Sequence, residues 1–270
     1  MPNTVINTRI LFSGNYDPIV TTWVSTVKSN GFQVPSASYL SKLNTFVVSN
    51  KSNLLLRDRF WIFAQETGCQ AAGRVSLINP TSTLLSEVNS PTWTALQGYT
   101  GNGTSMYLNT KYNPSTHGVK FTQNDGMIDV YTRLTIAAGT KAILGAFVSA
   151  TAQIWLSLNW TAIGKLYSVN TVGQATQANT TTQGLFSILR TTSNLQTLYK
   201  NGSSLGTNAN PTVSPVNNEI YILGANNNGV AGSFDTNQVS RASVGGAVGM
   251  NISQDYGTWQ AFMISLGTQV

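Results

Sequence analysis

From about residue 75 onward, the chain is a succession of short β-prone runs separated by turn-forming residues. In the stretch MIDVYTRLTI (residues 127–136), Ile128, Val130 and Leu134 fall on one face of an extended strand and Asp129 falls on the other. Many short strands with frequent turn signals are typical of a sandwich or jelly roll. We predict strands at 104–109, 119–123, 127–137, 141–148, 153–159, 164–169, 184–191, 195–200, 219–224 and 239–245.

The sharpest turn signal is Asn201-Gly202 within LYKNGSSLG (residues 198–206). Both residue types accept the positive φ that a two-residue hairpin turn needs, so this stretch predicts a β-hairpin. Tyr199 and Leu205 then belong to its two strands. The stretch contains no carboxylate, so it marks the fold and supplies no catalytic group.

Residues 16–68 differ from the rest, because their apolar residues recur at helical spacing. Asp17 and Pro18 predict the start of a first helix and Gly31 its end. A second helix is predicted within 35–51 and a third within 53–68. We therefore expect three regions: an N-terminal arm (1–15), a helical anchoring or oligomerisation module (16–68) and a jelly-roll domain (69–270). Near the C-terminus, 253–266 predicts a further short helix.

The composition excludes several classes of protein. Hydrophobic residues make up 41% and charged residues only 9%, whereas disordered chains have few aromatic residues and high net charge. The formal charge of +6 comes from scattered Lys and Arg without the clustering that nucleic-acid binding needs. Cys69 is the only cysteine, which excludes an internal disulfide. The N-terminus predicts no signal peptide, and no apolar run predicts a membrane span.

The sequence offers little support for an enzyme. Glycosidases need a pair of carboxyl groups that face one substrate, and the E-x-D-x-x-E pattern that can supply such a pair on one strand is absent here. Asp125 and Asp129 are the nearest pair in the β region, and along a strand they would lie about 13 Å apart. A cross-strand pair involving Glu219 or Asp235 stays open. His117, the only histidine, follows a turn and has no partner for nucleophilic catalysis.

The sequence offers candidate residues for two further types of site. Oxygen ligands for Ca²⁺ could come from 122–125 with Asp129, or from 232–238, although such residues more often satisfy turn backbone. We expect no cofactor and no other metal. Sugar sites use exposed aromatic residues on loops. The candidates for glycan binding are Trp93, Tyr99, Tyr112 and Phe234.

Several stretches together resemble a known family. These are SLINPTS (76–82), GYTGNGTSMYLNTKYNPST (98–116) and LYKNGSSLG, followed by NEIYILGANNNG (218–229). Their order is similar to that of bacteriophage virion proteins in which a short helical segment precedes a concanavalin A-like (laminin-G-like) jelly roll. The resemblance covers about residues 16–270.

That resemblance implies a mainly β fold and membership of a virion, and it implies no activity. We therefore expect a non-enzymatic structural protein of the capsid-decoration or head-fibre type, assembled in the host cytoplasm with other virion proteins and as a homo-oligomer. The expected anchoring residues are Ile10, Phe12, Trp23, Phe60 and Trp61. The alternatives are a tail-associated adhesin that binds host surface glycans and, third, a glycan hydrolase.

Overall fold

The computed structural model describes residues 16–137, 139, 141–149, 152–161, 164–171, 174–178 and 181–270. In this part of the chain, two mainly antiparallel sheets pack face to face. The predicted arm (1–15), including Ile10 and Phe12, lies outside the described residues. The predicted jelly-roll sandwich with small N-terminal helices is confirmed.

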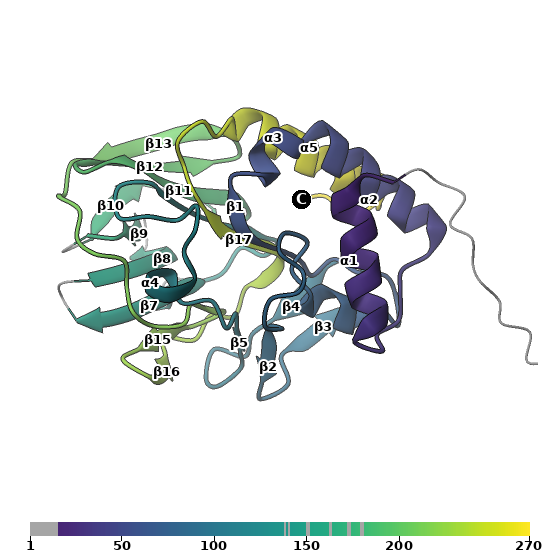
Figure 1. Cartoon of the computed structure of the whole chain (residues 1–270). Helices are drawn as coiled ribbons and strands as arrows, with labels where there is room; N and C mark the ends of the chain where they lie inside the picture. Colours follow the sequence, from purple (N-terminus) through teal and green to yellow (C-terminus); the bar gives the residue numbers. More distant parts are fainter. Residues whose placement is uncertain are drawn as a thin grey trace, which may run out of the picture.

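Sheet A is the sheet nearer the helices (Figure 1). Its described strands are β1 (Arg57–Ile62), β3 (Thr92–Thr94), β4 (Gly98–Thr100), β6 (Gly126–Thr132), β11 (Gly184–Thr192), β12 (Leu195–Lys200), β13 (Ser203–Asn208) and β17 (Gln238–Gly245). Their order in space is β13-β12-β11-β6-β17-β4-β3, and β1 pairs with β17. The central strands β6 and β17 are buried along their whole length.

Sheet B lies on the side away from the long helices (Figure 1). Its described strands are β2 (Ser86–Val88), β5 (Tyr107–Asn109), β7 (Leu144–Ser149), β8 (Ala152–Thr161), β9 (Gly164–Val169), β10 (Ala175–Ala178), β14 (Tyr221–Ile222), β15 (Ala225–Asn227) and β16 (Val230–Gly232). The order is β10-β9-β8-β7-β14-β5-β2, and the β15–β16 hairpin joins β7 through a parallel pairing.

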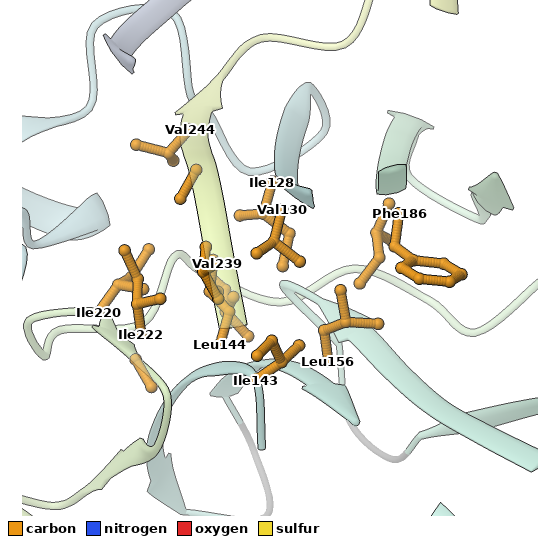
Figure 2. Close-up of a cluster of buried hydrophobic side chains, with 14 of the residues drawn as sticks. Ile128, Val130, Ile143, Leu144, Leu156, Phe186, Ile220, Ile222, Val239 and Val244 are labelled. Atoms are coloured by element: carbon orange, nitrogen blue, oxygen red, sulfur yellow. The ribbon is translucent and has the colours of Figure 1, made fainter. Parts of the chain in front are cut away.

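Apolar side chains from the two sheets meet in one core (Figure 2). Ile128 and Val130 of β6 and Val239 of β17 contribute from sheet A, while Leu144 of β7 and Ile222 of β14 contribute from sheet B. All five are at most 2% exposed. Burial of apolar surface on this scale is the main favourable contribution to folding.

The helices are α1 (Pro18–Ser29), α2 (Ala37–Ser49), α3 (Lys51–Leu54), α4 (Pro114–His117) and α5 (Ile252–Ser265), with a 3₁₀ turn at Gln70–Arg74. Asp17 caps α1 by accepting from the Ile19 amide, as predicted. The predicted C-terminal helix is α5, and the Asn251 side chain caps it by accepting from the Gln254 amide. The helices α1, α2 and α5 form a layer over the outer face of sheet A (Figure 1), so that a second apolar cluster joins Phe46 and Trp259 to Tyr131 of β6.

The predicted third helix is wrong. Within 53–68, residues 53–54 end the short helix α3, and residues 57–62 form the strand β1, which pairs antiparallel with β17. Trp61 points into the core between the sheets, whereas Phe60 and Ile62 point into the helical layer. Both faces of β1 are thus apolar, and such a continuous apolar run cannot be told from a buried helix by periodicity. The range 16–68 therefore includes a strand of sheet A.

A second correction concerns 119–123, which form a loop and no strand. The buried carboxylate of Asp58 accepts hydrogen bonds from the amides of Val119, Lys120 and Phe121. Those donors are therefore satisfied without a neighbouring strand. The Asn201-Gly202 hairpin is confirmed: it joins β12 to β13, with φ of 51° and 80° at its two turn residues.

Candidate functional site

Two of the predicted glycan-binding aromatic residues are buried. Tyr99 and Tyr112 are both 0% exposed. The Tyr99 hydroxyl donates to Glu87 Oε1 at 2.6 Å, and the Tyr112 hydroxyl donates to Asp58 Oδ2 at 2.8 Å. Burial raises the pKa of both phenols above the ordinary value. Their side chains are held in the interior, so they offer no surface to a sugar, which corrects the prediction.

The other two predicted aromatic residues are half-buried. Trp93 packs against the core, and its Nε1 donates to the carbonyl of Phe63 at 3.0 Å. Phe234 lies near Tyr107, with 6.0 Å between ring centroids. The structure therefore does not bring the four predicted residues together as one site. Phe234 alone belongs to an outward-facing aromatic group.

The predicted anchoring side chains in the described region are core residues. Trp23, Phe60 and Trp61 are at most 2% exposed, and Trp23 Nε1 donates to the carbonyl of Val75. They cannot contact another protein while the chain is folded. Sequence periodicity identifies apolar faces, but a face that packs internally gives the same pattern as a face that binds a partner.

The most concentrated charge in the described residues is an ion cluster between sheet A and α5. It consists of Arg57 from β1, Asp129 from β6, Arg241 from β17 and Asp255 from α5, and every side chain is 0% exposed. Arg57 Nη2 lies 2.9 Å from both Asp129 Oδ2 and Asp255 Oδ2, and Arg241 Nη2 lies 2.7 and 2.5 Å from them. Both carboxylates thus share the same two guanidinium groups.

Further contacts surround the ion cluster. Asn50 donates to Asp255 Oδ1 at 2.6 Å, and Arg241 lies 4.9 Å from the ring centroid of Phe60 and 5.1 Å from that of Trp259. Burial alone would raise the pKa of Asp255, but Arg241 and Arg57 outweigh it and hold that pKa well below its usual range. A carboxyl group that stays ionised and has no access to solvent is not a general acid, so the cluster is structural.

Every carboxylate of the chain accepts a hydrogen bond or ion pair from the protein itself, and all of them lie in the described residues. The partners are Lys51 for Asp17, backbone amides for Asp58, Asp125 and Asp235, Ser36 for Glu66, Tyr99 for Glu87, the two arginines for Asp129 and Asp255, and Asn109 for Glu219. A glycosidase needs two carboxyl groups that face one substrate. Asp129 and Asp255 come together because they bind the same two arginines, but both side chains are fully buried and cannot face a substrate.

The remaining polar candidates also bind their own chain. His117 is exposed, as expected, and its Nδ1 accepts from the Asn113 amide at 3.0 Å. Among the described residues, no group of three or more His, Cys, Asp or Glu side chains could hold a metal ion. Asp125 faces the amides of Ala247 and Val248, away from the arginines that hold Asp129. No helix in the described ranges is long and apolar enough to cross a membrane.

An aromatic and polar patch lies on the outer face of sheet B. Tyr107 of β5 stacks on Tyr221 of β14, with ring centroids 4.5 Å apart and an interplanar angle of 28°. Leu108, between Tyr107 and Asn109, points into the core, so its two neighbours point outward. Asn109 is directly paired with Tyr221 in the sheet. We call Tyr107, Asn109, Lys111, Glu219, Tyr221 and Phe234 the outer-face patch.

Polar groups border the aromatic pair. Glu219 Oε2 accepts from Asn109 Nδ2 at 2.6 Å and lies 3.6 Å from Lys111 Nζ. The side chains of Glu219 and Lys111 are 37% and 33% exposed. Burial, together with the neighbouring Tyr107 and Glu219, raises the pKa of Tyr221 to about 12. The patch thus presents a half-buried aromatic ring next to a hydrogen-bond acceptor and a cation.

Comparison with known proteins establishes the fold alone. No protein-family model and no curated protein matches the chain. Among solved structures, the chain is similar to a mutant Trypanosoma rangeli sialidase with trans-sialidase activity, at TM-score 0.55 and 12% identity over 91% of this chain and 39% of that one. It is also similar to the binding domain of botulinum neurotoxin serotype D, at TM-score 0.54 and 7% identity over 77% of this chain and 52% of that one.

Sequence reasoning missed most of the outer-face patch. Tyr107 lies within a predicted strand and Tyr221 within another, but the sequence does not show that the two strands are neighbours in sheet B. The alternation of inward and outward side chains along each strand does indicate which residues lie on the outer face. Leu108 and Ile222 are the apolar partners of a buried face, so Tyr107, Asn109 and Tyr221 must point the other way.

Proposed function

We propose that this chain is a non-enzymatic structural protein of a bacteriophage particle that displays its β-sandwich outward and is attached through its helical layer and N-terminal arm. The non-enzymatic part of the proposal rests on one observation: each Asp and Glu side chain already binds a donor of the protein itself. An acid or base in a glycan hydrolase needs a free face toward the substrate. The virion part rests on the ordered motifs in 76–82, 98–116 and 198–206.

The helical layer supplies a surface for attachment. A groove of about 250 Å³ runs between α2 and α5, with Phe46 and Phe262 at its base. Val48 of α2 is 57% exposed and Ile264 of α5 is 59% exposed. Neither residue lines the groove, but exposed apolar side chains on the same two helices add to the apolar surface that a partner could contact. This surface replaces Trp23, Phe60 and Trp61 as the proposed contact with another virion protein.

The experiment is incorporation into particles. Phage particles are purified from the producing host, and mass spectrometry tests whether they contain the chain. Particles are then produced with variant chains and tested in the same way. We expect the double variant Val48→Asp with Ile264→Asp to be lost from particles, because a charged side chain at an apolar contact is costly to desolvate. Val230→Asp is the matched control, since Val230 is 69% exposed on the far hairpin of sheet B. Absence of the wild-type chain from particles contradicts the proposal.

Deletion of residues 1–15 tests the arm and removes none of the described helices and strands. A longer truncation through residue 66 would remove β1 and Arg57 of the ion cluster, so its failure would not be informative. Normal incorporation of the shorter deletion contradicts attachment through the arm. The wild-type chain is also incubated with a panel of polysaccharides, and any cleavage contradicts the non-enzymatic assignment.

The outer-face patch favours a second function, the binding of glycans. Tyr107 is partly exposed where it stacks on Tyr221, so an aromatic side chain is accessible to a sugar, and Glu219, which lies near Tyr221 and pairs with Lys111, supplies hydrogen-bonding groups. On a glycan array, we expect Tyr107→Ala to abolish the binding shown by the wild-type chain. Tyr199→Ala, which changes a half-buried tyrosine of β12 in sheet A, is the control. No binding by the wild-type chain contradicts this second function.

A further inference from the structure

The groove between α2 and α5 contains a positive charge that the described part of the protein does not balance. Among the described residues that line the groove, Lys42 is the only charged one, and it is half-buried. None of the described residues forms a hydrogen bond or an ion pair with Lys42, whereas Lys51 pairs with Asp17 and Lys111 with Glu219. A molecule that covers Lys42 must therefore supply a carboxylate, because an unpaired charge is costly to desolvate.

The shape of the groove fits a helix. The side chains of Phe46 and Phe262 form its apolar base, and α2 and α5 flank them. On the α5 side lie the exposed residues Gly257 and Ala261, one turn apart. None of the surrounding described atoms lies within 4 Å of a Cβ added at Gly257, so the groove is open there. An amphipathic helix can lay its apolar face into a groove of this kind.

The chain has no free carboxylate to place beside Lys42. All nine Asp and Glu residues lie from Asp17 onward, so residues 1–15 contain none. Each of the nine already binds a donor of its own chain. In a two-fold contact between two copies, the same surfaces would meet and bring two Lys42 side chains to one interface, where like charges repel. The counter-charge consequently has to come from a different molecule.

We propose that the α2–α5 groove binds an amphipathic helix of a different virion protein. The apolar face of that helix covers Phe46 and Phe262, and one of its Asp or Glu side chains pairs with Lys42. This inference rests on the proposed function, because it gives the chemistry of the partner at the surface through which the chain is attached. A lipid with a carboxylate head group would share that chemistry, and the cross-linking experiment below distinguishes it.

Two variants test charge and shape separately. We expect Lys42→Glu to lower incorporation into particles at least about tenfold, because it places a carboxylate against the carboxylate of the partner. The matched control is Lys120→Glu, which makes the same charge change at an exposed lysine after α4.

The shape variant is Gly257→Leu, which fills the open part of the groove. We expect it to lower incorporation by a similar factor, although leucine forms helices better than glycine and thermal unfolding should show an intact fold. Incorporation of Lys42→Glu or of the folded Gly257→Leu chain at the level of Lys120→Glu overturns the proposal.

Carbodiimide cross-linking of wild-type particles identifies the partner. The reagent joins Lys42 Nζ to a carboxylate in contact with it as an amide, and the carbodiimide takes up the water that is lost and leaves as a urea. Mass spectrometry should locate the linked Asp or Glu in an amphipathic segment of a different virion protein. The link should be absent with Lys42→Arg, which lacks the reactive amine.

The other outcomes contradict the proposal in distinguishable ways. A link from Lys42 to a second copy of the chain, a fatty acyl amide on Lys42, or no link at all overturns the inference, and the first two identify a copy or a lipid as the occupant. Absence of the wild-type chain from particles contradicts the virion assignment and this inference together. Presence of the wild-type chain with unaffected variants contradicts this inference alone.

Discussion

The two sheets of the sandwich have the same strand type but different environments. Sheet A has apolar core on one face and the helical layer on the other, so that β6 and β17 are buried throughout. The outer face of sheet B carries half-buried tyrosine, lysine and glutamate side chains. The ion cluster lies on the covered face and the outer-face patch on the open one. Polar residues on the covered face hold layers together, whereas Lys111 and Glu219 on the open face are partly exposed to solvent.

The largest expected effect comes from breaking the ion cluster on the covered face. Asp255→Asn leaves Arg57 and Arg241 buried with only Asp129 as a counter-charge. We expect a loss of about 3–5 kcal/mol in the free energy of unfolding, measured by urea denaturation. Asp17→Asn is the control, because it removes a pair with the exposed Lys51 and should cost about 1 kcal/mol or less. Equal losses in the two variants would contradict a special role for the covered face.

Two Asn-Gly hairpins allow a matched comparison of the sheets. Gly202 joins β12 to β13 at φ 80°, and Gly229 joins β15 to β16 at φ 90°. An added Cβ at Gly202 would lie 3.1 Å from Ser253 Cα of α5, whereas none of the surrounding atoms lies within 4 Å of one at Gly229. We expect Gly229→Ala to cost about 1 kcal/mol from backbone strain and Gly202→Ala about 1 kcal/mol more. Thermal unfolding of the two variants measures the difference.

Two buried carboxylates should respond to pH in opposite directions. Burial raises the pKa of Asp235 to about 6, and the Asn237 amide only partly offsets this effect. Asp235 has its folded pKa above its unfolded value near 4, so its contribution to stability falls as pH rises from about 4 to 6. Asp255 has a lowered pKa, so its contribution is present above pH 4 and is lost in acid.

The corresponding variant is Asp235→Asn. At pH 8 it should be more stable than the wild-type chain by on the order of 1–2 kcal/mol, because the wild type then carries a buried charge. The advantage should vanish below about pH 4, where the wild-type carboxyl group is neutral. Urea denaturation at several pH values measures this, and a constant difference across the range would contradict the assigned pKa.

The smallest expected effect on stability is at the outer-face patch. Tyr107→Ala removes a half-buried ring from the open face, so we expect a loss of about 1 kcal/mol or less. Tyr131→Ala removes a fully buried ring that contacts Trp259 in the helical layer and should cost about 3–5 kcal/mol. Urea denaturation of the two variants measures both losses in the free energy of unfolding. A large loss for Tyr107→Ala would mean that the patch is structural.

The same difference between the faces explains what could be predicted from the sequence. Strands with one polar and one apolar side, and the Asn201-Gly202 turn, follow directly from local patterns. For β1 the local pattern predicts a helix, because Phe60, Trp61 and Ile62 are all apolar, although the structure buries them on alternating sides of a strand. The helical layer makes both of its faces apolar. That layer is a tertiary contact, and no window of local sequence contains it.

The candidate sites were harder to predict for a related reason. The sequence shows how many aromatic residues and carboxylates the chain has, but burial decides which of them are accessible. Tyr99 and Tyr112 lie in turn-rich stretches, yet their hydroxyls are tied to Glu87 and Asp58. Tyr107 and Tyr221 are more than one hundred residues apart, so their stacking depends on the order of strands in sheet B.

The packing of α5 against the beginning of the chain has a consequence for folding on the ribosome. Asn50 binds Asp255, and the Asn251 amide binds Asn53, so segments about two hundred residues apart close the helical layer. Until α5 is synthesised, the apolar sides of α1, α2 and β1 lack their cover, and Arg57 lacks one of its carboxylates. Contacts of such long range slow folding and leave apolar surface exposed to aggregation in the meantime. The nascent chain should therefore depend on chaperones until its last helix has emerged.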